Sequence, residues 1–162
     1  MDENDNEFLK IAYKTGRIKD ASEAFEEFPP EEEWHKGRAE YFLKEDSEIY
    51  SIYTVGDIVF VKKFIYESGE EEHNHLFVII TQDNLVVPIE NFCMLISSKL
   101  NKLRYRTNKL LKKNEINGLD KDSVVKTDYM YKIDSKQILF KIGTVDMEKV
   151  EEYKEEFLNN II

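Results

Sequence analysis

The residues best suited to proton chemistry in this 162-residue chain are two histidines, His73 and His75, separated by one asparagine. Imidazole has a reference pKa of about 6.5, so it can accept or donate a proton near neutral pH. If the segment is extended, both rings point to one face. A metal site is disfavoured because His35, the only other histidine, lies in an acidic region far away in the sequence. We therefore expect acid–base chemistry and no metal, with two exposed polar loop residues as the plain alternative.

Basic residues are concentrated in one segment of the chain. Residues 91–114 carry seven lysines and arginines and no acid, whereas residues 1–56 carry 15 acids and seven bases, a net charge of −8. A concentrated positive surface is typical of phosphate binding, although the overall net charge of −10 argues against nucleic acid. A solvated lysine-rich face is the alternative. The seven residues are Lys99, Lys102, Arg104, Arg106, Lys109, Lys112 and Lys113.

The elements that must position these residues change in kind near residue 50. Before it, the pattern predicts a helix ending near Gly16, a second helix starting near Asp20 with Ile18 on its apolar face, and a third after Pro30. Beyond it, β-branched and aromatic residues predict strands at 58–64, 76–82, 85–89, 91–97, 123–133 and 138–143. An apolar stripe predicts a C-terminal helix; its members are Val150, Tyr153, Phe157 and Ile161. Together these elements predict an α+β fold, a small, partly open barrel with helices packed on it.

Composition excludes several protein classes. Apolar residues make up 41% of the chain, while glycine and proline number only six and three, so a core is possible and collagen or low-complexity classes are excluded. The single cysteine, Cys93, excludes an intramolecular disulfide and suits a reducing compartment, where a buried thiol is its plain interpretation. The N-terminus is acidic, unlike a signal peptide, and no apolar run approaches the length of a membrane span. We expect a cytoplasmic protein with no membrane partner.

Four sequence stretches follow one another in an order that is typical of one family. They are Gly-Asp-Ile-Val-Phe-Val at 56–61, a histidine and aliphatic run at 75–80, an aliphatic strand and basic residues at 96–102, and Leu-Asp-Lys-Asp-Ser-Val-Val at 119–125. Asp134, Gly143 and the closing helix follow. On these motifs, about residues 52–162 resemble the PemK/MazF family of toxin endoribonucleases from type II toxin–antitoxin systems.

The resemblance implies both a fold and an activity. The fold is an SH3-like, partly open β-barrel over 51–162 with a C-terminal helix, and residues 1–50 are an acidic helical extension that typical short members lack. The activity is cleavage of single-stranded RNA without a metal or any other cofactor. The implied partners are single-stranded RNA, a cognate antitoxin protein and a second copy of the chain in a homodimer.

The resemblance also implies site residues. In metal-free cleavage the ribose 2′-hydroxyl attacks the adjacent phosphate. The reaction needs a group that transfers protons and a hydrogen-bond donor or cation that stabilises the crowded phosphorane. The family uses an arginine and a threonine, and the matching positions are His75 and Ser97. Serine keeps the hydroxyl, whereas histidine replaces a permanent charge by a titratable group. The residues expected to bind RNA are Lys99, Lys102, Arg104 and Arg106 through phosphates, and Tyr129 and Tyr131 by stacking on bases; both tyrosines can equally be strand-face residues.

Other interpretations stay open at this point. A catalytically inactive member of the same family, binding RNA or protein, is the second functional hypothesis, and an interaction module without a nucleic-acid role is the third. Residues 1–50 are a structural extension that covers an apolar barrel face, an antitoxin-like acidic cover over the basic segment, or a docking module for another protein.

Overall fold

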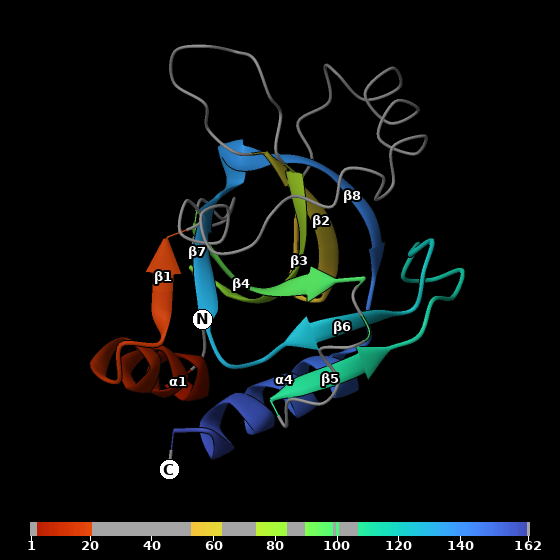
Figure 1. Ribbon diagram of the computed structural model, residues 1–162. Helices are drawn as coiled ribbons and strands as arrows, with labels where there is room; N and C mark the ends of the chain where they lie inside the picture. Colours follow the sequence, from red (N-terminus) through yellow and green to blue (C-terminus); the bar gives the residue numbers. More distant parts are fainter. Residues whose placement is uncertain are drawn as a thin grey trace.

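The computed structural model describes residues 3–20, 53–62, 74–83, 90–98, 100 and 107–161. Within these residues the chain forms one mixed sheet and two α-helices, one of them C-terminal (Figure 1). The elements in chain order are α1 (Glu3–Lys14), β1 (Ile18–Asp20), β2 (Asp57–Lys62), β3 (Asn74–Gln82), β4 (Glu90–Ser97), β5 (Asn108–Leu111), β6 (Ser123–Lys126), β7 (Met130–Asp134), the 3-10 helix η2 (Ser135–Gln137), β8 (Ile138–Thr144) and α4 (Met147–Asn159).

The sheet is strongly curved, and its strand order is β1-β7-β4-β3-β2-β8 (Figure 1). The hairpin of β5 and β6 joins this order through β6, which pairs with the end of β4. Neighbouring strands are antiparallel except for β1 and β7, which are parallel. Because β1 and β8 stand at the two ends of the order, the strand pairing does not close into a ring within the described part of the chain.

The predicted strands are confirmed at β2, β3, β4 and β8, with one difference further along and one segment outside the described residues. The strand expected over 123–133 is two strands, because the chain turns away at Thr127. The backbone N–H and the hydroxyl of Thr127 both donate to the carbonyl of Thr107, which ends β6. As a result β6 pairs with β5 and with the end of β4, whereas β7 pairs with the first half of β4 and with β1. The strand expected at 85–89 lies outside the described residues.

The N-terminal segment departs further from the prediction. Helix α1 ends before Gly16, which has the positive φ of 70° typical of a helix C-terminus. Ile18 then lies in strand β1 opposite Met130 of β7, so the prediction of a helix there is wrong. The carbonyl of Arg17 accepts from the N–H of Met130 at 2.9 Å, and the pairing with β7 keeps the backbone extended at Ile18. The helices expected beyond residue 20 lie outside the described residues.

Gly56 and Asp57, at the start of β2, connect this strand to the end of β8. Gly56 has φ +93°, and its carbonyl accepts from the N–H of Val145 at 2.8 Å; an added Cβ would lie 2.7 Å from the carbonyl oxygen of Val145. Asp57 is buried, and its carboxylate accepts from the N–H of Thr54 at 2.9 Å and lies 3.3 Å from Nζ of Lys141 on β8. These contacts connect β2 to the end of β8, just before α4 begins.

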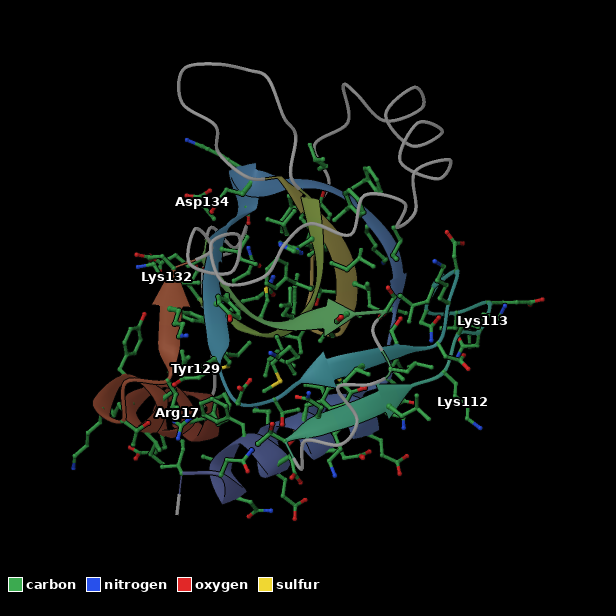
Figure 2. The ribbon with its side chains drawn as sticks, in the orientation of Figure 1. Arg17, Lys112, Lys113, Tyr129, Lys132 and Asp134 are labelled. Carbon is green, nitrogen blue, oxygen red and sulfur yellow. The ribbon has the colours of Figure 1, made fainter. Side chains whose placement is uncertain are left out.

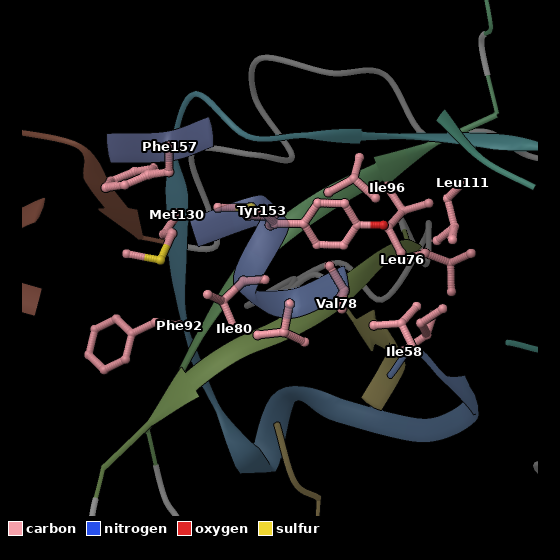
Figure 3. Close-up of a cluster of buried hydrophobic side chains, with 14 of the residues drawn as sticks. Ile58, Leu76, Val78, Ile80, Phe92, Ile96, Leu111, Met130, Tyr153 and Phe157 are labelled. Atoms are coloured by element: carbon pink, nitrogen blue, oxygen red, sulfur yellow. The ribbon is translucent and has the colours of Figure 1, made fainter. Parts of the chain in front are cut away.

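Both faces of the sheet are buried. On the face that we call the helix face, residues of β2, β3 and β4 pack with residues of α4 (Figure 3). Phe8, Leu9 and Ala12 of α1 belong to the same cluster. Phe8 lies 5.3 Å from Phe157 of α4, ring centre to ring centre. The alternate residues of the strands form a second face, with a cluster that contains Val59, Val61, Phe77, Ile79, Cys93, Leu95, Tyr131 and Ile133. The predicted stripe of the C-terminal helix is confirmed at its three residues Val150, Tyr153 and Phe157, all of them buried.

Tyr153 places a hydroxyl inside the helix face, where its ring lies among aliphatic residues of the sheet (Figure 3). The hydroxyl has no hydrogen-bond partner in the described part of the chain. Burial raises the pKa of the phenol, and the nearby charges of Glu152 and Asp146 raise it further. At alkaline pH this phenol stays neutral in the folded state and ionises in the unfolded state. The free energy of unfolding therefore falls as the pH rises in that range.

We expect Tyr153→Phe to protect the protein against alkaline unfolding. Below about pH 10, the usual pKa of tyrosine, the parent keeps the full contribution of this residue. Above it, only the unfolded state releases the proton, so the free energy of unfolding falls by about 1.4 kcal/mol per pH unit toward the raised folded pKa. Urea unfolding at pH 8 and 10.5 measures this loss, and the Phe variant should lack it. Equal losses in both proteins would contradict the burial of the hydroxyl.

Candidate functional site

His75 and Ser97 are brought together by the register of β3 and β4. Leu76 pairs with Ile96, so the next step along this antiparallel ladder sets His75 opposite Ser97. Both side chains lie on the second face, since their neighbours Leu76 and Ile96 lie on the helix face. Directly opposed residues have Cβ atoms about 5 Å apart. The sheet therefore makes one site of two residues that are distant in sequence.

The pair is covered in this structure. His75 is 5% exposed and Ser97 2% exposed. The imidazole lies edge-on to the ring of Phe77, at 6.4 Å between ring centres. An RNA phosphate can reach these two side chains only when the atoms above them move aside.

The two tyrosines that were expected to stack on bases have different surroundings. Tyr131 is 3% exposed and packs edge-on against Phe77 at 5.7 Å, which fits the alternative of a strand-face residue. Tyr129 is half-buried, and Nζ of Lys19 and Cζ of Arg17 lie 4.0 and 5.1 Å from the centre of its ring (Figure 2). Base stacking stays a prediction, and Tyr129 meets it better than Tyr131.

The residues expected to bind phosphates lie outside the described part of the chain; they are Lys99, Lys102, Arg104 and Arg106. Their role stays a prediction. From the rest of the basic segment, Lys109 pairs with Glu156 of α4 at 3.4 Å. Lys112 and Lys113 are exposed beyond β5, far from Arg17 and Tyr129 in the view of Figure 2.

Two cations beside Tyr129 carry no functional signal in the sequence. Arg17 and Lys19 belong to the predominantly acidic front of the chain, where no motif marks them. They come to Tyr129 because β1 pairs with β7, and the guanidinium of Arg17 also donates to the carbonyl of Asp128 at 3.5 Å. The only sequence signal was their positive charge, which carries no information on the partner strand.

Three other features bear on the chemistry. Cys93 is buried, and burial raises the pKa of its thiol, so it remains protonated near neutral pH and is a poor nucleophile. Among the described residues, no cluster of three or more His, Cys, Asp or Glu side chains is arranged to hold a metal ion. Neither α1 nor α4, the helices of the described part, has the length and apolar character needed to span a membrane.

Comparison with known protein families identifies a match. The sequence model of the family described as PemK-like, MazF-like toxin of type II toxin–antitoxin system matches residues 54–160. No curated protein matches the chain. The matched range contains His75, Ser97 and Tyr129, and it begins after α1 and β1.

Proposed function

Because the chain belongs to the PemK-like, MazF-like toxin family of type II toxin–antitoxin systems, we propose that it is an endoribonuclease that cleaves single-stranded RNA without a metal. In this proposal the protein acts in the cytoplasm as a homodimer, and a cognate antitoxin protein silences it. The curved sheet then corresponds to a small SH3-like, partly open barrel. The observation that carries the proposal is the cross-strand position of His75 and Ser97 on one face of the sheet, within the range that the family model matches.

The pair can divide the work of the reaction. His75 accepts the proton of the ribose 2′-hydroxyl while the 2′-oxygen forms a bond to phosphorus. The bond from phosphorus to the 5′-oxygen breaks, and the imidazolium returns the proton to that leaving oxygen. The products are a 2′,3′-cyclic phosphate and a 5′-hydroxyl. A neutral imidazole and its conjugate acid are both accessible near neutral pH, which suits one residue to both steps.

Ser97 has a different role in this scheme. Its hydroxyl donates to a non-bridging oxygen of the phosphate, where charge develops in the phosphorane. The additional positive charge comes from the basic residues that follow it in sequence, namely Lys99, Lys102, Arg104 and Arg106.

One observation favours a second candidate function. The exposed fractions of 5% for His75 and 2% for Ser97 leave little surface for a reacting phosphate. A family member that binds RNA or protein on this fold and does not cleave would need neither side chain to be accessible.

The test is incubation of the full-length protein with a long single-stranded RNA in the presence of EDTA. Cleavage at defined positions that leaves 5′-hydroxyl and 2′,3′-cyclic phosphate ends supports the proposal. We expect Ser97→Ala to lower the cleavage rate by a factor of about 10 or more, because it removes one donor to the phosphorane. Ser97→Thr keeps the hydroxyl and should retain most of the rate. Folded protein that binds the RNA without cutting it would favour the second candidate.

A further inference from the structure

The second face of the sheet extends beyond the His75–Ser97 pair toward β1. In the strand order, β3 and β4 are followed by β7 and then by β1. Cys93 of β4 pairs with Tyr131 of β7. Tyr129, just before β7, packs against the buried cluster of the second face, which contains Leu95, two residues before Ser97. Tyr129 therefore lies on the same face of the sheet as the side chains of β4 that lead to Ser97.

The β1 strand adds two cations to the same face. Ile18 pairs with Met130, and both side chains belong to the helix face, so the flanking Arg17 and Lys19 lie on the second face. Asp20 lies on the opposite face of β1 from Lys19, together with Ile18. Along the strand order, one face of the sheet therefore presents a cation on β1 and another just before it, an aromatic ring beside β7, a hydroxyl on β4 and an imidazole on β3.

The β1 end of this row is the accessible end. Arg17, Lys19 and Tyr129 are all partly exposed, whereas His75 and Ser97 are covered. The cations approach the ring to 5.1 and 4.0 Å, and the hydrogen bond to the Asp128 carbonyl also holds the guanidinium in place. Cations that bind phosphates and flat groups that stack on bases are the combination by which proteins hold single-stranded nucleic acids.

We propose that Arg17, Lys19 and Tyr129 form a nucleotide subsite that holds single-stranded RNA a few nucleotides from the phosphate at Ser97 and His75. The ligand class rests on the proposed function. The two cations lie outside the matched range 54–160, so the subsite is an addition that the N-terminal segment of this chain makes to its family domain. The subsite gives Arg17 and Lys19, within the acidic residues 1–50, a role in binding RNA. This role differs from that of a cover over the basic segment 91–114.

The test is equilibrium binding of full-length protein to a labelled single-stranded RNA whose 2′-hydroxyls are methylated, which prevents cleavage. We expect the double variant Arg17→Ala/Lys19→Ala to bind about 10-fold more weakly. Its plot of log Kd against log salt should be shallower by between about 1 and 2, since each phosphate contact contributes about 0.7 on a single strand. Tyr129→Leu should also weaken binding, whereas Tyr129→Phe keeps the ring and should bind like the parent.

The matched control is Lys136→Ala/Lys149→Ala, which removes two charges from partly or fully exposed lysines on η2 and α4. It should bind nearly as tightly as the parent at physiological salt. Equal weakening in both double variants would show that only the net charge matters, and it would overturn the subsite. Unchanged binding by Arg17→Ala/Lys19→Ala would overturn it as well. Thermal unfolding confirms that each variant is folded.

The cleavage assay separates this proposal from the proposed function. If the parent binds the methylated RNA through Arg17 and Lys19 but does not cleave unmodified RNA, the subsite stands and the ribonuclease fails. If the parent cleaves and the double variant binds and cleaves equally well, the ribonuclease stands and the subsite fails.

Discussion

Replacement of His75 by glutamine is expected to lower the rate of RNA cleavage by a factor of about 100 or more, because the site loses the group that takes and returns the proton. Glutamine has a similar size and is polar, so it can occupy the covered position beside Phe77 without opening a large cavity. Single-turnover cleavage at saturating RNA measures the chemical step apart from binding. RNA affinity, measured with the methylated strand, should change little.

The neighbouring histidine supplies a matched control. His73→Gln makes the same change two residues earlier and is expected to leave the cleavage rate near that of the parent. If His73→Gln abolishes cleavage and His75→Gln does not, the proton-transfer role belongs to His73. Equal rates in all three proteins would remove the histidines from the mechanism.

Deletion of residues 1–20 is expected to destabilise the fold by about 5 kcal/mol, a large share of the stability of a domain of this size. The deletion removes three buried apolar side chains of α1 from the helix face, and burial of one Leu or Phe contributes about 1.5–3 kcal/mol. It also removes β1 and exposes the edge of β7, including the N–H of Met130, which then becomes available to other chains. Urea unfolding and size-exclusion chromatography should show a lower midpoint and self-association.

Two point variants locate the effect within α1. Phe8→Ala removes a buried ring and should cost about 3 kcal/mol, whereas Ile11→Ala, on the exposed side of the same helix, should cost less than about 1 kcal/mol. A monomeric truncated protein with an unchanged midpoint would contradict this account. It would support instead the division into a separate extension at 1–50 and a domain at 51–162, which stays a prediction.

Much of the sheet and the last helix could be predicted from the sequence, because their signals are local. The aliphatic runs of β3 and β4 and the apolar stripe of α4 each lie within a dozen or so neighbouring residues. The family was predictable for the same reason, since its motifs are short stretches in a fixed order, and the matched range 54–160 confirms it.

The sequence by itself therefore determined the family, the candidate pair His75 and Ser97, and the elements whose periodicity is complete within one segment. Tertiary structure alone decided that Ile18 lies in a strand, that Thr127 ends β6, and that the candidate pair is covered. It also brought Arg17 to Asp128 and Tyr129, across a separation of 111 positions for the hydrogen bond. The physical reason is that backbone pairing and burial depend on which distant segment is adjacent, and a local pattern of residue types does not encode that partner.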